Sequence, residues 1–320
     1  MRHFMPSLLI ALATLTSSGC LVIEKKTMVM ILPPVSNEVQ MYYVFEGISV
    51  LDTKEATLQQ AQHQLDNLKK DDFSFFGPGT DKENPLLQHC RFEKLRFFVD
   101  AKRKRPLCAD RRMTILDRKE FAKGLNKSIA RELLTVSVTQ DAIKKALEEL
   151  KKESSRNDAD DFGAGPFHKT AEGLLQILNS FDAASIKQLQ AAVGEGIRTE
   201  EGFRWLRFEP ETLRLVLPAT PECAKQIVAD PKSKNWLKQM RTFVQPIDLQ
   251  ICDEGLAIVL GKKGKVIRFA YTDTRSYRAD HEADLAKYAG SPKAIILDDG
   301  KAANADRLIE QFVAEKTKKR

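Results

Sequence analysis

The residues with the most distinctive chemistry lie near the start of the chain. Cys20 follows three small residues, Ser17, Ser18 and Gly19. A cysteine thiolate is the strongest nucleophile among the side chains, and small residues before it let an extended chain enter the cleft of a peptidase. These residue types make Cys20 the first candidate for chemistry in the chain.

The residues that end in Cys20 have the three-part layout of an export signal. Arg2 supplies the positive start, Phe4 to Leu15 is mostly apolar, and residues 16–19 are small. The stretch is too short to span a membrane as a helix. It resembles the signal peptides of bacterial lipoproteins, whose lipobox ends in an invariant cysteine after two small residues. Ser17 departs from the leucine usual at that position, and the resemblance covers residues 1–20 only.

This resemblance implies cleavage after Gly19, a thioether-linked diacylglycerol on Cys20 and an acylated new N-terminus carrying chains such as palmitate. Two acyl chains give a stable anchor, at about 0.8 kcal/mol per buried methylene. The body would then lie in the periplasm or another extracytoplasmic space. The alternatives are an uncleaved anchor and an ordinary secretory signal followed by a chance cysteine.

Composition limits the class of protein. The chain has 320 residues, 42% hydrophobic, with 51 basic and 44 acidic residues, which excludes a wholly disordered chain. Removal of residues 1–19 takes away one basic residue, so the net charge falls from +7 to 50 − 44 = +6. This mild excess favours anionic lipids or cell-wall polymers. We expect no nucleic-acid partner and no cofactor.

The densest basic cluster is the run Lys102, Arg103, Lys104 and Arg105, between strand-like stretches at 91–100 and 107–116. Alternate residues of a hairpin share a face, so several of these side chains could meet one anionic surface. Candidates are a lipid headgroup, lipopolysaccharide and the carboxylates of peptidoglycan. The alternative is a soluble hairpin tip that discourages pairing between sheet edges.

Four cysteines remain after processing, namely Cys90, Cys108, Cys223 and Cys252. An even number in an exported protein permits two disulfides, with three possible pairings. The pairing of sequence neighbours joins Cys90 to Cys108 and Cys223 to Cys252. In a simple hairpin, however, Cys108 faces a residue near Val99 rather than Cys90. Four buried thiols are the alternative.

Catalytic patterns are weaker. The chain lacks a G-x-S-x-G nucleophile motif, and His281-Glu282 lacks the second histidine of a zinc-protease helix. We therefore expect no metal site. The pairs Asp280 with Glu282 and Asp298 with Asp299 could serve acid–base hydrolysis. Both pairs stand at predicted helix starts, where the helix dipole favours acidic residues.

Hydrophobic spacing predicts an α+β fold of antiparallel hairpins and a meander packed with several helices. The first strand is expected at 27–32, after a short tether from Cys20. Other predicted elements are helices at 54–69, 140–153 and 303–316, a hairpin at 203–217, and a meander of strands at 247–252, 256–260 and 265–272. The stretch 153–167 is rich in Ser, Asp, Asn and Gly, so we expect a linker there between regions 20–152 and 168–320.

Together these features predict a membrane-anchored lipoprotein of the cell envelope that acts by binding or scaffolding. Its partner would be another envelope protein or a cell-wall polymer, in addition to membrane lipid at Cys20. The alternative is an exported hydrolase whose carboxylate site the sequence does not locate.

Overall fold

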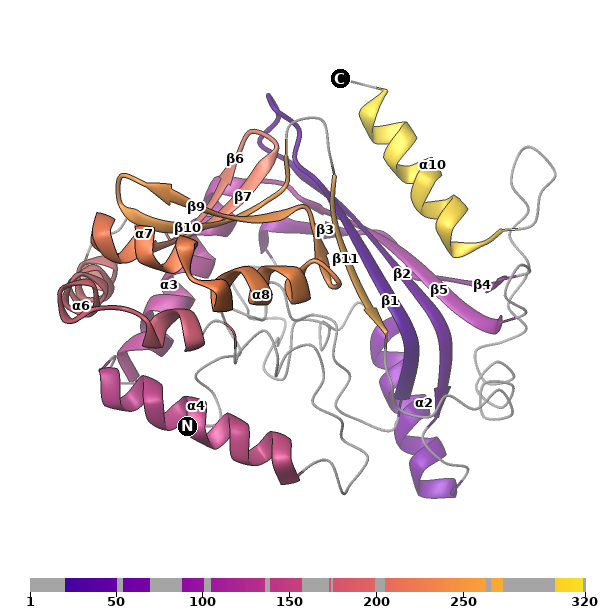
Figure 1. The fold of residues 1–320 in the computed structure, drawn as a ribbon. Helices are drawn as coiled ribbons and strands as arrows, with labels where there is room; N and C mark the ends of the chain where they lie inside the picture. Colours follow the sequence, from indigo (N-terminus) through magenta and orange to yellow (C-terminus); the bar gives the residue numbers. More distant parts are fainter. Residues whose placement is uncertain are drawn as a thin grey trace. The chain divides into compact units, whose positions relative to one another are not determined.

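The computed structural model describes residues 21–50, 54–69, 88–100, 105–135, 139–156, 173, 175–198, 205–262, 266–272 and 303–318. Figure 1 shows an α+β fold of antiparallel hairpins and helices, which confirms the predicted class. The described helices are α2 (Glu55–Lys69), α3 (Arg118–Thr135), α4 (Gln140–Arg156), α6 (Ala183–Arg198), α7 (Pro221–Ala229), α8 (Pro231–Met240) and α10 (Ala305–Thr317).

The strands fall into a large and a small sheet. Those that build the large sheet are β1 (Leu21–Ile31), β2 (Val39–Val50), β3 (Cys90–Phe92), β4 (Arg96–Asp100), β5 (Arg105–Ile115) and β11 (Ile267–Thr272). The small sheet contains β6 (Leu206–Glu209), β7 (Thr212–Pro218), β9 (Ile247–Cys252) and β10 (Gly255–Leu260). The short strand β8 is Val244–Gln245.

The chain forms two compact units, each assembled from separate stretches. As far as the chain is described, unit 1 comprises Leu32–Asn37 and Asp117–Ile267, and unit 2 comprises the chain up to Ile31, Glu38–Leu116 and Arg268–Arg320. This division differs from the contiguous regions 20–152 and 168–320 that the sequence suggests. Helix α4 runs to Arg156, four residues into the predicted linker, and the rest of that linker lies outside the described residues.

The large sheet of unit 2 has the order β3-β5-β2-β1-β11, and β4 also pairs with β5. Strand β2 reads VQMYYVFEGISV, rich in the β-branched and aromatic residues that strands favour. It is buried along almost its whole length, so both of its faces are covered. Its antiparallel partner β1 follows it in register from Leu21 opposite Val50 to Ile31 opposite Gln40.

Strand β1 starts earlier than its sequence suggests. We expected a strand at 27–32 after a tether, but β1 begins at Leu21. The polar run Glu24-Lys25-Lys26 makes the first half of this strand hard to recognise from the sequence, because charged residues are uncommon in strands. In the structure Lys25 pairs with the buried Glu46, its Cα partner on β2. The first described strand therefore starts at the residue that follows Cys20 in the sequence.

Helix α10, drawn in yellow in Figure 1, contacts β1 and β2. Its buried residues are Ala305, Leu308, Ile309 and Phe312, spaced by three, one and three, as on one face of an amphipathic helix. Asn304 caps its start by accepting a hydrogen bond from the backbone N–H of Arg307 at 2.9 Å. The predicted helices at 54–69, 140–153 and 303–316 are thus confirmed as α2, α4 and α10.

The small sheet of unit 1 has the order β6-β7-β10-β9. The predicted hairpin is confirmed: β6 and β7 turn at Pro210 and Glu211, and Glu211 takes a φ of 64°. Strand β10 is buried at every position, and it lies between β7 and β9.

The predicted meander is wrong in its third strand. Strands β9 and β10 form the expected hairpin, but β11 (Ile267–Thr272) joins the large sheet beside β1. The reason is that β7 already occupies the second edge of β10, so β10 has no edge to offer β11. Among the described residues, we find no helix with the length and apolar character needed to cross a membrane.

Candidate functional site

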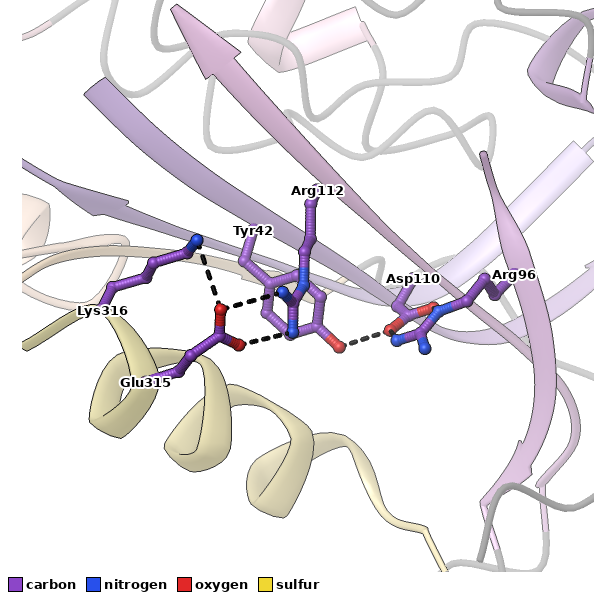
Figure 2. Close-up of polar contacts among 6 residues, drawn as sticks. All are labelled: Tyr42, Arg96, Asp110, Arg112, Glu315 and Lys316. Carbon is purple, nitrogen blue, oxygen red and sulfur yellow. Dashed lines mark hydrogen bonds and ion pairs between the residues drawn. The ribbon is translucent and has the colours of Figure 1, made fainter. Parts of the chain in front are cut away.

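One face of the large sheet gathers charged residues from well-separated parts of unit 2. Side chains alternate between the two faces along a strand, so Tyr42 and its Cα partner Arg112 lie on the same face. Asp110 lies on this face too, because it is two positions from Arg112 along β5, and so does its Cα partner Arg96 on β4. Figure 2 shows these four residues beside Glu315 of α10. We call this set the α10 cluster.

Asp110 is the centre of the α10 cluster. Its side chain is 0% exposed, and the Tyr42 hydroxyl donates to its Oδ2 atom at 2.5 Å. The Arg96 guanidinium binds the same carboxylate in a two-pronged manner, with Nε 2.9 Å from Oδ1 and a terminal nitrogen on Oδ2. A bidentate arginine is among the strongest partners for a carboxylate. Both oxygens of Asp110 are therefore engaged.

The protonation states follow from this geometry. Burial, followed by the charge and hydrogen bond of Asp110, raises the pKa of the Tyr42 phenol well above its usual range. The hydrogen bond that Arg96 donates to Asp110 likewise raises the pKa of Arg96. The phenol consequently stays neutral and acts as a hydrogen-bond donor, and the guanidinium stays charged.

A second contact ties the last turns of α10 to β5. The two terminal nitrogens of Arg112 lie 3.3 Å from Oε1 and 2.9 Å from Oε2 of Glu315. The Arg112 guanidinium also lies 5.6 Å from the ring centroid of Phe312, which itself stacks on Tyr42 at 4.9 Å. Burial acts to raise the pKa of Glu315, but Arg112 and Lys316 outweigh it and lower this pKa.

The first turn of α10 has its own ionic contacts. Lys25 Nζ lies 2.9 Å from Oε1 of the fully buried Glu46 and 4.0 Å from Oδ1 of Asp306. Arg268 on β11 lies 3.8 Å from the same Asp306 oxygen. Thus α10 meets the sheet through ion pairs at both of its ends and through the Phe312 ring between them.

This arrangement suits attachment better than proton transfer. A general base needs a carboxylate or imidazole that can reach a substrate proton, whereas Asp110 already holds Tyr42 and Arg96. The exposed pair of Arg112 with Glu315 contributes only about 0.2–1 kcal/mol. Burial of the Phe312 ring, at roughly 1.5–3 kcal/mol, therefore contributes more to holding α10 than this ion pair does.

The sequence-predicted sites lie partly outside the described residues. Cys20, Lys102, Arg103 and Lys104 are among the residues that the structure does not describe. Their neighbours are described: Leu21 starts β1, Asp100 ends β4 and Arg105 starts β5. The carboxylates at 280, 282, 298 and 299 also lie outside the described residues.

All four cysteines of the predicted disulfides are among the described residues. None of the four cysteines Cys90, Cys108, Cys223 and Cys252 is part of a disulfide within the described chain. Cys90 on β3 is the Cα partner of Ile115 on β5, and Phe98 on β4 is the Cα partner of Cys108 on β5. Phe98 is the neighbour of Val99, the partner expected for Cys108. Seven residues of strand separate Cys108 from Ile115, about 23 Å, and a disulfide needs Cα atoms within about 7 Å. Burial raises the pKa of the Cys90 thiol to about 12.

Sequence reasoning missed the α10 cluster. The signal in the sequence is the run Asp110-Arg111-Arg112 inside a strand-like stretch. Aspartate is depleted in strands, and a buried aspartate needs a partner, so this run indicates a paired carboxylate in the sheet. The sequence cannot show that the partners are Tyr42 and Arg96. Within the described stretches, no group of three His, Cys, Asp or Glu side chains is arranged to hold a metal ion.

Comparison with known proteins adds no relative. No family model matches the chain, and no curated protein or solved structure matches it significantly.

Proposed function

We propose that the chain is a lipid-anchored protein of the cell envelope that acts by binding or scaffolding. The observation that carries this proposal is the sequence of residues 1–20, in which a basic start, an apolar stretch and three small residues precede Cys20. Cleavage after Gly19 would leave every described element intact.

The α10 cluster supports a binding role over a catalytic one. Its central carboxylate, Asp110, holds Tyr42 and Arg96, and its outer pair joins Arg112 to Glu315. The contacts of Asp110 join strands β2, β4 and β5, and the contact of Arg112 with Glu315 joins the sheet to α10, so these charged groups are already engaged in holding the fold together. The hydrolase alternative depends on the carboxylates at 280, 282, 298 and 299, and no described contact favours it.

Intact mass of the protein extracted from membranes with detergent tests the anchor. We expect a chain that starts at Cys20 and carries a diacylglyceryl group and an N-terminal acyl chain. A Cys20→Ser variant should keep residues 1–19 and carry no lipid, because a hydroxyl is a much weaker nucleophile than a thiolate. The matched control is Cys252→Ser, which should be processed and lipidated like the parent. An unmodified chain that starts at Met1 in the parent protein would refute the anchor.

The binding role needs its own experiment. The native lipidated protein is cross-linked in intact envelopes, and its complexes are recovered after solubilisation. We expect one envelope component to be captured in a saturable, stoichiometric amount, and to be lost with the unprocessed Cys20→Ser variant. Turnover of a cell-wall polymer by the purified protein, abolished by substitution of Asp280 or Asp298, would instead establish the hydrolase.

A further inference from the structure

Four methionines lie together on one face of the large sheet. Met30 on β1 is the Cα partner of Met41 on β2, and Met41 is in turn the Cα partner of Met113 on β5. Cα partners on neighbouring strands point to the same face, so these three thioethers form a row across three adjacent strands. Met28 lies on this face too, two positions from Met30 along β1. We call these four residues the methionine cluster.

The methionine cluster and the α10 cluster lie on opposite faces of the sheet, because Met41 and Tyr42 are consecutive residues of β2. All four methionines of the cluster are buried. The Tyr43 hydroxyl lies 3.8 Å from the sulfur of Met41 and 3.7 Å from the sulfur of Met113, so the two sulfurs converge on a single atom. Methionine has three rotatable bonds and adapts its shape readily, so both sulfurs can turn toward one small ion at this point.

A thiol lies beside this point of convergence. Cys90 on β3 is the Cα partner of Ile115 on β5, two positions beyond Met113, so Cys90 and Met113 are diagonal neighbours on one face. Diagonal neighbours are about 7–8 Å apart, within reach of long side chains. Burial, followed by the charge of Cys90, raises the pKa of Tyr43, as expected for a thiol close to the same hydroxyl. Cys90 is only half-buried, and it therefore gives an ion access to the buried thioethers.

The charge on this face limits which ions can bind. Thioether and thiolate sulfur are soft ligands that favour Cu(I), whereas Mg²⁺ and Ca²⁺ require oxygen ligands. Arg111 is the Cα partner of Tyr43, and its positive charge acts to lower the pKa of that phenol. A cation that binds beside Arg111 therefore needs an anionic ligand. Cys90 provides one when its thiol loses a proton.

We propose that Cys90, Met41 and Met113 bind one Cu(I) ion through their three sulfur atoms. The Cys90 thiol releases its proton to solvent, and the thiolate and the two thioethers donate electron pairs to the ion without any change of oxidation state. The thiolate cancels the charge of the ion, so binding adds no net charge beside Arg111. The absence of a metal site was expected from the spacing of histidines, a criterion that does not consider thioether ligands. The proposal does not depend on the lipid anchor.

Methyl NMR of the full chain labelled with [methyl-¹³C]methionine tests this site. The probe is Ag(I), which is soft and monovalent like Cu(I) and keeps one oxidation state. We expect the methyl signals of Met41 and Met113 to shift to a saturating value, and the signal of Met240, which is buried in α8, to stay in place. Unmoved signals of Met41 and Met113, or equal shifts at Met240, would overturn the proposal and leave the methionine cluster as hydrophobic core.

Matched substitutions test the two thioethers. Leucine is close to methionine in volume and is well tolerated in its place in protein cores, but it has no sulfur. Met41→Leu with Met113→Leu should weaken Cu(I) binding at least tenfold in competition with a coloured Cu(I) chelator, and Met240→Leu should leave it unchanged. The remaining cysteines are present in every variant, so their contribution cancels. If the double variant keeps its urea midpoint and binds Cu(I) as tightly as the parent, the thioethers are not ligands and the proposal is wrong.

Cys90→Ser tests the anionic ligand. We expect this variant to lose most of the Ag(I)-induced shift at Met41 and Met113, because a serine hydroxyl does not supply the negative charge that the ion needs beside Arg111. Shifts of undiminished size in Cys90→Ser would show that the thiolate is not a ligand and would refute the three-sulfur site. The NMR experiment on the parent protein decides the proposal even if a variant does not fold.

Discussion

The hydroxyl of Tyr42 can be removed with little other change to the α10 cluster. In Tyr42→Phe the ring still stacks on Phe312, at a centroid distance of 4.9 Å in the parent structure. What disappears is one hydrogen bond of 2.5 Å to the buried carboxylate of Asp110. Hydrogen bonds to charged groups contribute about 1.5–3 kcal/mol. Because Arg96 still neutralises Asp110, the cost should lie in the lower part of that range, at about 2 kcal/mol.

The assay must report on unit 2. Both tryptophans, Trp205 and Trp236, belong to unit 1, so tryptophan fluorescence reports on the wrong unit. Hydrogen exchange of peptides from β2 and β5 reports directly on the strands that the bond connects. A loss of about 2 kcal/mol should speed exchange through opening of these strands roughly 30-fold, because 1.4 kcal/mol is a factor of ten.

The neighbouring residue is the control. The Tyr43 hydroxyl lies 3.8 Å from the sulfur of Met41 and 3.7 Å from that of Met113, and thioether sulfur is a weak acceptor. Tyr43→Phe should therefore cost less than about 1 kcal/mol. If the two variants accelerated exchange equally, or if Tyr42→Phe had no effect, the reasoning about Asp110 would be refuted.

Three further predictions follow from described contacts. Burial and Asp110 raise the pKa of Tyr42, so the folded state keeps a proton that the unfolded chain loses above about pH 10. The free energy of unfolding should therefore fall as pH rises beyond that value. Urea midpoints measured across this range should fall less steeply with pH in Tyr42→Phe. Because burial raises the pKa of Cys90 to about 12, iodoacetamide at pH 8 should alkylate it more than a hundredfold more slowly than free cysteine; equal rates would contradict the burial. A Cβ added at Gly173 would lie 1.8 Å from the Trp236 ring, so Gly173→Ala should destabilise unit 1 by about 1–3 kcal/mol, and an unchanged tryptophan-fluorescence midpoint would show that the ring can move aside.

The sequence was most informative where structure depends on near neighbours. The residue types Thr220-Pro221 are enough to start helix α7, because Thr220 accepts a hydrogen bond from the backbone N–H of Cys223 at 3.2 Å and proline suits the first helical position. The hairpin predicted at 203–217 is formed by β6 and β7, which turn at Pro210 and Glu211. Each of these features is specified within a few residues, so the amino-acid types suffice.

Only the tertiary structure decided which distant residues meet. The pairing of Asp110 with Tyr42 spans 68 positions, and β11 lies beside β1 although about 240 residues separate them. The start of β1 was missed because Lys25 reads as a solvated residue until Glu46, from the next strand, neutralises it in the buried sheet. Register between strands depends on the burial of whole faces and on partners that come from elsewhere in the chain. The predicted export signal would need no such partner, because its whole pattern lies within residues 1–20.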